Sequence, residues 1–252
     1  MADITLSQLF KNICDSIRTK TGSSDKIKHI KIPDEIAKIV SSDDLLSKTI
    51  TELKTHVATI PDYAFYRQSN LTSVTMPNVK SIGAYAFNYC GKLKKVELPA
   101  SCKSIGDSAF MECYLLETIN IPDGVKVIPV GCFRGDYTLQ SPKIPGSVTS
   151  IGSMAFQGAT FETITLPQVY QMGLSVFAKP KYDGTGLKTL IIRNAVGICS
   201  LSSSSSFNNT PIGKAEDGAV IYVPDNLVDT YKQATNWSVF ADIIKPLSEL
   251  GV

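Results

Sequence analysis

The middle of the chain repeats one arrangement of apolar and polar residues every 21 to 23 residues. Each copy ends in phenylalanine, and the copies read TIPDYAF (59–65), SIGAYAF (81–87), SIGDSAF (104–110), VIPVGCF (127–133), SIGSMAF (150–156) and QMGLSVF (171–177). Successive phenylalanines are separated by 22, 23, 23, 23 and 21 residues, and a seventh, degenerate copy carries Phe207. Such a period is typical of solenoids, in which each repeat forms one coil.

A second pattern follows each phenylalanine, with apolar residues at its fourth and sixth positions and usually a final proline. Its copies are LTSVTMP (71–77), LKKVELP (93–99), LETINIP (116–122), LQSPKIP (139–145), FETITLP (161–167), LKTLIIR (187–193) and GAVIYVP (218–224). The alternation predicts a short, half-buried strand that ends at the proline, because proline has no N–H to donate. In one copy Cys132 replaces the motif alanine and Pro142 lies inside the predicted strand, so we expect a local irregularity there.

One such unit cannot bury its own apolar face, whereas stacked units bury each Phe, Ile and Leu against its counterpart in the next coil. The pattern therefore predicts an α/β repeat fold. About seven coils, each with a short parallel strand, occupy residues 45–224, with a helical cap at 1–44 and another at 225–252.

Helical spacing supports both caps. Near the N-terminus an apolar stripe is formed by Leu6, Leu9, Ile13 and Ile17, and a second helix is expected from Pro33. Beyond the repeats, helical spacing links Leu227, Val228 and Tyr231, and then Val239, Phe240, Ile243 and Ile244. We expect Asp225 to cap the first of these helices and Trp237 to help cover the open apolar end of the array.

Composition excludes several classes of function. Apolar residues make up 43% of the chain and charged residues 19%, so it can form a core, and its formal charge is only +2. No run of Lys or Arg exceeds two residues, which disfavours nucleic acid or an anionic membrane as a partner. No apolar run is long enough to span a bilayer, and the start of the chain lacks the features of a secretory signal.

The sequence indicates no catalytic chemistry. It contains no GxGxxG, Walker, GxSxG, HExxH or EF-hand motif, and its two histidines have no metal-binding partners nearby. We therefore expect no catalytic residues, cofactor or metal, and interpret the Gly-rich insertion 183–186 and the serine run 202–206 as loops. Cys90 and Cys113 share one motif position and lie within disulfide reach, but we favour packed free thiols.

Two surfaces could bind a partner. The segment just beyond each phenylalanine gathers residue types that are enriched in interface cores, although the same residues could simply pad the coils. These residues are Tyr66, Tyr89, Met111, Tyr114, Arg134 and Tyr137. The second surface is the polar face of the strands, where charges of both signs alternate. It comprises Lys94, Glu97, Glu117, Asn120, Lys143, Glu162 and Lys188.

The combined pattern SIGxxAFxxCxxLxxVxLPxxVxxIGxxAF resembles the BspA-type leucine-rich repeat over about residues 49–224. The resemblance implies a right-handed solenoid used for adhesion or protein binding, with a protein or cell-surface glycan as its ligand. The N-terminal segment, with SIRTKTGSSDKIK followed by PDEIAKI, resembles a helical module of tail and minor structural proteins of phages from Gram-positive hosts.

These resemblances suggest a host-recognition protein of a phage or prophage tail, located in the virion. The alternative is a secreted or surface adhesin of a commensal bacterium, exported by an unrecognised route. An enzyme built on a solenoid is a third hypothesis, which no group of residues supports. The sequence does not determine the oligomeric state.

Overall fold

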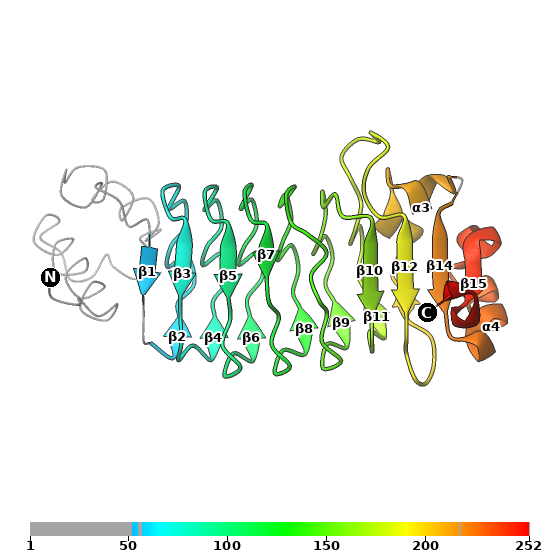
Figure 1. The fold of residues 1–252 in the computed structure, drawn as a ribbon, viewed down its shortest axis with the longest axis horizontal. Helices are drawn as coiled ribbons and strands as arrows, with labels where there is room; N and C mark the ends of the chain where they lie inside the picture. The colour runs from blue at the N-terminus through cyan, green and yellow to red at the C-terminus, as the bar shows by residue number, and fades with distance from the viewer. Residues whose placement is uncertain (1–51, 55–56, 217, 252) are drawn as a thin grey trace, which may run out of the picture.

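The structure is a computed structural model that describes residues 52–54, 57–216 and 218–251. Its coils follow one another in a single row, and each coil passes along the same face of the molecule (Figure 1). We call the strands on this face the front ladder. They are β1 (Glu52–Lys54), β3 (Ser73–Thr75), β5 (Lys95–Glu97), β7 (Thr118–Ile119), β10 (Thr163–Leu166), β12 (Thr189–Ile192), β14 (Val220–Val223) and β15 (Ile244–Pro246).

The front ladder is parallel, and its register advances by one repeat from coil to coil. Val74 of β3 pairs with Val96 of β5, which pairs with Ile119 of β7. These residues are buried, while their neighbours in sequence are exposed or half-buried. The structure thus confirms the predicted solenoid with a short parallel strand in each coil.

Each of the central coils also contains a second strand, which the sequence pattern did not predict. These two-residue strands follow the proline turn and form a lower ladder, also parallel. They are β2 (Thr59–Ile60), β4 (Ser81–Ile82), β6 (Ser104–Ile105), β8 (Val127–Ile128), β9 (Ser150–Ile151), β11 (Gln171–Met172) and β13 (Ser200–Leu201). In every one the first residue points outward and the second is buried in the core, so the Ile of the SIG motif anchors it.

The phenylalanine segment links the coils through backbone hydrogen bonds of its own. Every second N–H donates to the next coil, as in Tyr85 to Asp107, Phe87 to Ala109 and Tyr89 to Met111, at 2.7–2.9 Å. The outer two residues of this set adopt left-handed backbone, with φ of 55° at Tyr85 and 62° at Tyr89. This alternation turns every second amide toward the same neighbour.

Two prolines interrupt the ladders. Residues 139–145 form no strand, so the front ladder divides between β7 and β10, because Pro142 has no N–H to continue it. The lower ladder divides between β6 and β8, where Pro129 stands in place of a motif glycine whose N–H donates in other coils. The irregularity expected at Pro142 is confirmed. Cys132 plays no part in it, because its carbonyl accepts from Phe110 as the regular pattern requires.

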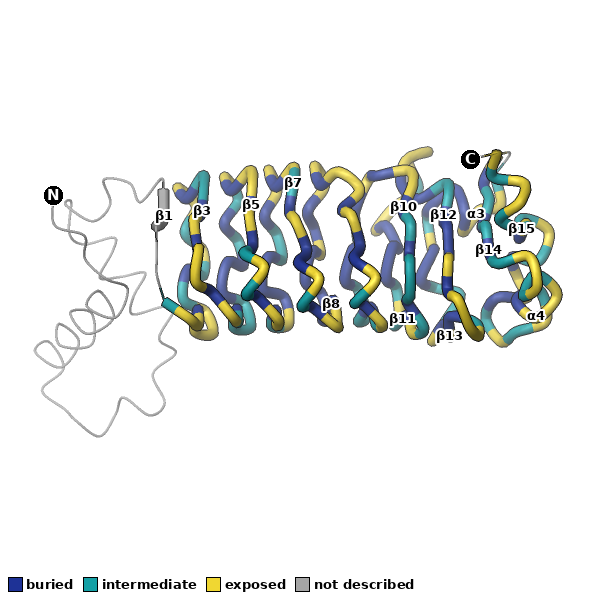
Figure 2. Tube along the Cα trace, turned by 60° about the horizontal axis from the view of Figure 1, so that its bottom comes forward, coloured by how far each residue is buried: buried dark blue, intermediate teal, exposed yellow. Residues whose placement is uncertain are grey.

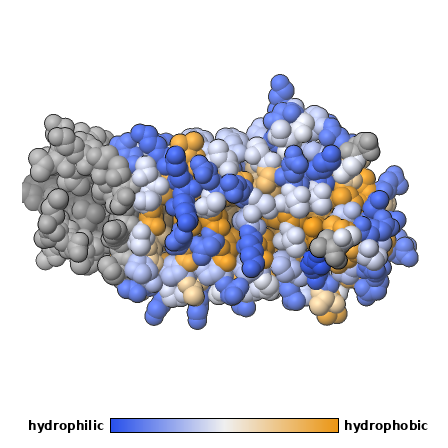
Figure 3. All heavy atoms as spheres, in the orientation of Figure 1, coloured by the Kyte–Doolittle hydropathy of each residue, from blue (hydrophilic) through white to orange (hydrophobic). Residues whose placement is uncertain are grey.

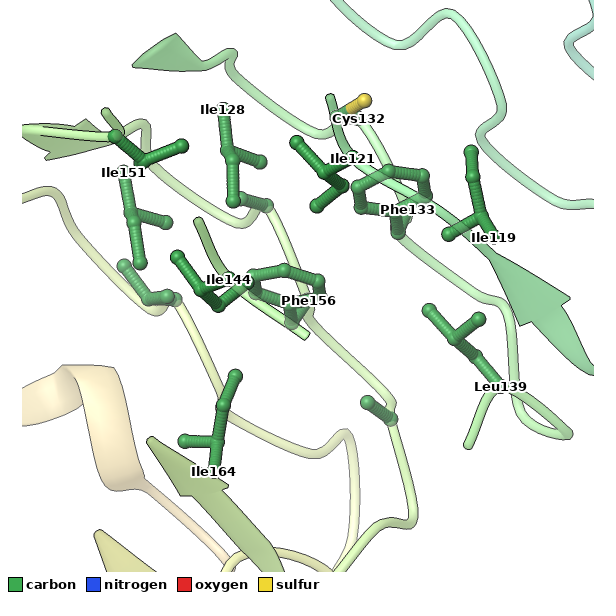
Figure 4. Close-up of a cluster of buried hydrophobic side chains, with 14 of the residues drawn as sticks. Ile119, Ile121, Ile128, Cys132, Phe133, Leu139, Ile144, Ile151, Phe156 and Ile164 are labelled. Carbon is green, nitrogen blue, oxygen red and sulfur yellow. The ribbon is translucent and has the colours of Figure 1, made fainter. Parts of the chain in front are cut away.

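The core is a continuous stack of phenylalanine rings that runs through the array. Rings of successive coils lie 5.1–6.0 Å apart and within 17° of parallel, from Phe65 to Phe207. Aliphatic side chains from both ladders surround them (Figure 4), and buried residues line the inside of every coil (Figure 2). Phe207, the degenerate seventh copy, closes the stack as predicted.

The C-terminal segment covers the end of this stack. It contains η3 (Asp225–Leu227), α4 (Val228–Gln233), η4 (Ser238–Ile243) and η5 (Leu247–Leu250) around β15. Trp237 is fully buried, and its ring lies 6.0 Å from that of Phe207. The side chain of Asp225 accepts a hydrogen bond from the Ser248 N–H instead of capping a helix, and Ile244 begins a strand instead of extending a helix, so both of these expectations were wrong.

Three remaining features, each of which was predicted from the sequence, are the serine run, the cysteines and the N-terminal helices. The serine run is only in part an open loop, because η2 (Ser204–Phe207) includes its last three residues and Ser206 donates to the Gly173 carbonyl. The next turn is α3 (Pro211–Lys214). The five cysteines of the described residues are free and buried, which confirms packed thiols at Cys90 and Cys113. The predicted N-terminal helices fall on residues 1–44, outside the described residues.

Candidate functional site

Tyrosine and arginine side chains gather over the first two described coils. Tyr63 and Tyr85 stack with ring centroids 4.9 Å apart, and Tyr66 meets Tyr89 edge to face at 6.2 Å. The Arg67 guanidinium lies 5.2 Å from the centroid of Tyr66 and 5.4 Å from that of Tyr89. These five residues, which we call the tyrosine cluster, form a partly exposed surface whose side chains contact one another through their rings and the Arg67 guanidinium.

The backbone of this cluster is unusual for its residue types. Tyr63, Arg67, Tyr85 and Tyr89 all have positive φ, between 55° and 62°, which costs a non-glycine residue about 1–2 kcal/mol. Two coils further on, glycines stand at the corresponding positions 131 and 135. Bulky side chains therefore occupy positions where glycine would be less strained, and their mutual stacking offsets part of that cost.

A second pair of tyrosines lies in the two following coils. Tyr114 and Tyr137 are 42% and 46% exposed, and their rings are nearly parallel at 6.3 Å. Gly91 and Gly158 flank this tyrosine pair: a Cβ at Gly91 would lie 3.2 Å from the ring of Tyr114, and one at Gly158 would lie 2.9 Å from that of Tyr137. No side chain at these two positions covers the rings.

The surroundings of Tyr114 raise the pKa of its hydroxyl. Desolvation and a hydrogen bond with the Glu112 side chain raise the pKa of Tyr114 to about 12. Like any tyrosine hydroxyl, the phenol is protonated at neutral pH, and its ring contributes apolar area, a combination that suits protein interfaces.

The structure brings most of the predicted aromatic surface together. Tyr66 and Tyr89 touch, as do Tyr114 and Tyr137. Of the other two predicted residues, Met111 is half-buried and Arg134 is exposed. Sequence reasoning missed Tyr63, Arg67 and Tyr85. Tyr63 and Tyr85 lie two residues before a phenylalanine, outside the segment that the prediction covered, whereas Arg67 lies inside that segment and was not singled out.

The predicted binding residues on the polar face of the strands do not gather into a cluster. Lys94, Glu97, Glu117, Lys143 and Glu162 are exposed, and Lys188 is half-buried. Glu97 forms an ion pair with Lys95 at 2.6 Å, in which both side chains are more than 60% exposed. Such a pair contributes little stability.

Asn120 has a structural role on this face. Its amide accepts from the Leu98 N–H at 2.6 Å and donates to the Leu98 carbonyl at 2.7 Å, which continues the front ladder beyond the end of β7. Two shallow hollows of about 700 and 300 Å³ share Leu98 and Asn120 as lining residues. Figure 3 shows apolar surface between the hydrophilic side chains along this face.

Buried ionisable groups lie in the core. Burial raises the pKa of the Cys90 thiol to about 12 and that of the Cys113 thiol well above its usual value, so neither is a ready nucleophile. Asp136 is fully buried and accepts a 2.8 Å hydrogen bond from the Cys113 N–H, while its other oxygen has no partner. Burial raises the pKa of this carboxyl strongly.

Two further features bear on function: groups of side chains that could hold a metal ion, and helices that could cross a membrane. In residues 52–54, 57–216 and 218–251, no three His, Cys, Asp or Glu side chains gather closely enough to hold a metal ion. Among the helices of that same part of the chain, none has the length and apolarity needed to cross a membrane.

Comparison with known proteins agrees with the fold. Residues 58–182 match the BspA type leucine-rich repeat region, in six copies. The chain is similar to a solved leucine-rich repeat protein from Bacteroides ovatus, with 21% identity and a TM-score of 0.43, over 68% of this chain and 54% of that one. A leucine-rich cell surface protein from Faecalibacterium prausnitzii has 22% identity and a TM-score of 0.43, over 80% of this chain and 60% of the other.

A third similar structure is the pneumococcal vaccine antigen PcpA, with 20% identity and a TM-score of 0.48, over 79% of this chain and 43% of that one. The chain thus spans about half the length of these solved structures. No curated protein matches it.

Proposed function

Because the chain is a leucine-rich repeat protein whose residues 58–182 form a BspA-type repeat region, we propose that it is a non-catalytic module that binds a protein partner. The observation that carries the proposal is the exposed aromatic surface formed by the tyrosine cluster and the tyrosine pair. Tyrosine and arginine dominate the energetics of many protein interfaces. Here they are fixed by stacking before any partner arrives, which lowers the entropic cost of binding.

Adhesion is the biological role that this binding would serve. The narrower assignment to a phage or prophage tail depends on residues 1–44, which lie outside the described residues, and a surface adhesin of a commensal bacterium requires the same binding surface. Neighbouring genes distinguish the two: tail, baseplate or lysin genes beside this one support the phage assignment, and their absence contradicts it.

Mutation of the tyrosine pair tests the binding surface. Fluorescently labelled protein would be applied to intact bacterial cells, with and without protease treatment of the cell surface. Tyr114→Ala combined with Tyr137→Ala should lower the bound fraction at least about tenfold, as expected for the loss of two interface anchors. Tyr170→Ala combined with Tyr222→Ala is the matched control, because it removes two half-exposed tyrosines elsewhere.

A third variant separates the two candidate surfaces. Lys94→Ala combined with Glu117→Ala alters the strand face and leaves every tyrosine in place. Loss of binding in this variant, with normal binding by the tyrosine variant, would place the contact on the strand face and contradict the proposed site. Binding that survives protease treatment would contradict a protein partner. Circular dichroism melting curves confirm that each variant is folded.

A further inference from the structure

The two segments that carry the tyrosine pair are joined through a buried aspartate. Asp136 immediately precedes Tyr137 in sequence, and Cys113 immediately precedes Tyr114. One carboxyl oxygen of Asp136 accepts a 2.8 Å hydrogen bond from the Cys113 N–H. On the other side of Tyr137, the Thr138 hydroxyl donates to the Tyr114 carbonyl at 3.0 Å. The spacing of the two tyrosines therefore depends on the side chains at both neighbours of Tyr137.

The contact made by Asp136 differs from that of Thr138, because it comes from an ionisable group that is shielded from water. Asp136 is 0% exposed, and its second carboxyl oxygen has no hydrogen-bond partner. The coils on either side carry uncharged residues, Cys113 and Ala159, at the same motif position. An anion without a compensating partner is costly to bury, so this packing suits the protonated carboxyl better than the carboxylate.

The groups that face Asp136 also favour its protonated form. The negative charge of Glu112, in the preceding coil, raises the pKa of Asp136 further, in addition to burial, which is the larger cause. The bond from the Cys113 N–H acts in the opposite direction. The thiols of Cys113 and Cys132 lie close enough for the charge of Asp136 to raise their pKa values as well. Arg134, two residues before Asp136, is exposed, and none of the ion pairs between described residues includes Asp136.

We propose that Asp136 is a positioning residue that makes binding by the tyrosine pair depend on pH: the pair binds its partner while Asp136 is protonated and binds it less tightly once Asp136 ionises. This inference rests on the proposed function, because it concerns the same two rings. Once ionised, the carboxylate needs a second donor besides the Cys113 N–H. Water supplies one when the segment that carries Tyr137 moves away from Cys113, and that movement separates Tyr137 from Tyr114.

A pH series of the cell-binding assay tests the proposal. Labelled protein is applied to the same intact bacterial cells between pH 5 and pH 9, a range in which Tyr114 stays protonated because its pKa is about 12. Wild type should lose affinity at least about tenfold as pH rises, since release of one proton allows up to about tenfold per pH unit. Asp136→Asn keeps an acceptor for the Cys113 N–H and cannot ionise, so it should lose less than about twofold.

NMR gives a readout that needs no partner. In protein with ¹³C-labelled tyrosine, Tyr114→Phe and Tyr137→Phe assign the two ring signals. Both signals should move with pH around one midpoint in wild type and stay constant in Asp136→Asn. Glu112→Gln removes a negative charge that raises the pKa of Asp136, so its midpoint should lie at lower pH. Asp123→Asn is the matched control, because it removes an exposed carboxylate elsewhere and should leave the midpoint unchanged.

Several results would overturn the proposal. Ring signals that stay constant in wild type would do so, as would equal pH dependence in wild type and Asp136→Asn, or binding that stays level while the rings move. If Asp136→Asn does not fold, Asp136→Ala replaces it, because alanine stands at this motif position in the next coil, and it should abolish the pH dependence of the ring signals.

Failure of this inference can be told apart from failure of the proposed function. Loss of binding in the Tyr114→Ala, Tyr137→Ala double variant, together with a flat pH profile of wild type, would contradict the role of Asp136 alone. Unchanged binding by that double variant, with ring signals that still follow Asp136, would instead contradict the proposed binding surface.

Discussion

At the scale of single residues, close packing between coils decides which residues the repeat can use. The glycine of the SIG motif shows this directly. A Cβ at Gly106 would lie 2.4 Å from the Ala84 backbone nitrogen, and one at Gly152 would lie 2.6 Å from that of Val130. Neither glycine has positive φ. These positions therefore need glycine because the backbone of the preceding coil occupies the space of a side chain.

Substitution of this glycine should be costly although alanine is a small residue. Gly106→Ala forces two coils apart at their backbones, and overpacking of this kind costs about 1–3 kcal/mol. Gly146→Ala is the control, because its Cβ would meet nothing within 4 Å, and it should change stability by less than about 1 kcal/mol. Urea denaturation followed by circular dichroism measures both, and equal stabilities would contradict the packing explanation.

The buried carboxyl of Asp136 should make stability depend on pH. Burial raises its pKa in the folded state above the unfolded value of about 3.9. The folded state then binds more protons, so stability is complete below pH ~4 and falls as pH rises toward the folded pKa, by up to about 1.4 kcal/mol per pH unit.

Asp136→Asn tests this dependence, because it keeps an acceptor for the Cys113 N–H and removes the titration. The variant should lose less unfolding free energy than wild type between pH 4 and pH 7 in urea denaturation series. Asp123→Asn controls for the loss of one negative charge at an exposed position. Parallel stability curves for wild type and Asp136→Asn would show that the buried carboxyl does not titrate in this range.

At the scale of elements, three sets of backbone hydrogen bonds join neighbouring coils: the front ladder, the lower ladder and the bonds of the phenylalanine segment. Proline removes one donor from one set at a time. Pro129 interrupts the lower ladder and Pro142 the front ladder, in different coils. The phenylalanine segment remains continuous across both interruptions, as its bonds from Phe110 to Cys132 and from Phe133 to Ala155 show.

Restoring a donor at position 142 should extend the front ladder. Pro142→Val supplies an N–H that, in the register of the neighbouring coils, faces the following coil, and a side chain with high strand propensity. The new hydrogen bond contributes about 0.5–1.5 kcal/mol, but the loss of proline's rigidity in the unfolded state offsets part of it. Hydrogen exchange followed by NMR should find the new amide at position 142 protected. Exchange at the rate of an exposed loop amide would show that the ladder stays broken.

At the scale of the whole molecule, the stacked core needs an end that water cannot enter. The C-terminal segment covers this end of the core with apolar side chains and also joins it through hydrogen bonds. Trp237 Nε1 donates to the Cys199 carbonyl, and the Tyr231 hydroxyl accepts from the Cys199 N–H, both at 2.7 Å. The two aromatic rings also meet edge to face at 5.3 Å. The cap thus continues the hydrogen bonding of the coils as well as their core.

Loss of this cap residue should weaken the whole array, because coils of a solenoid depend on their neighbours. Trp237→Ala removes a fully buried ring and leaves the Cys199 carbonyl without its donor, at a cost of about 3–5 kcal/mol. Trp237→Phe keeps most of the apolar contact and should fall between this variant and wild type. Thermal melting measured by calorimetry ranks the three, and a melting temperature unchanged in Trp237→Ala would contradict a capping role.

The sequence alone determined the coil and its interior. A repeat period can be read without a structure because each coil buries the same positions, and this placed the phenylalanine stack, the front strands and the seventh copy at Phe207. It also located Pro142 as an interruption. It missed the lower ladder because two residues are too few to show a period, and it missed the strand at Ile244–Pro246 because a short apolar pair fits helix and strand equally.

Only the tertiary structure decided which side chains meet on the surface. Tyr63 and Tyr85 lie 22 residues apart in sequence, and so do Arg67 and Tyr89, so neither pair forms a cluster that composition can reveal. Stacking brings residues one repeat apart within a few ångströms, and packing constrains only those that face inward. The sequence therefore specified the scaffold, whereas the surfaces that could contact a partner emerged when the coils were stacked.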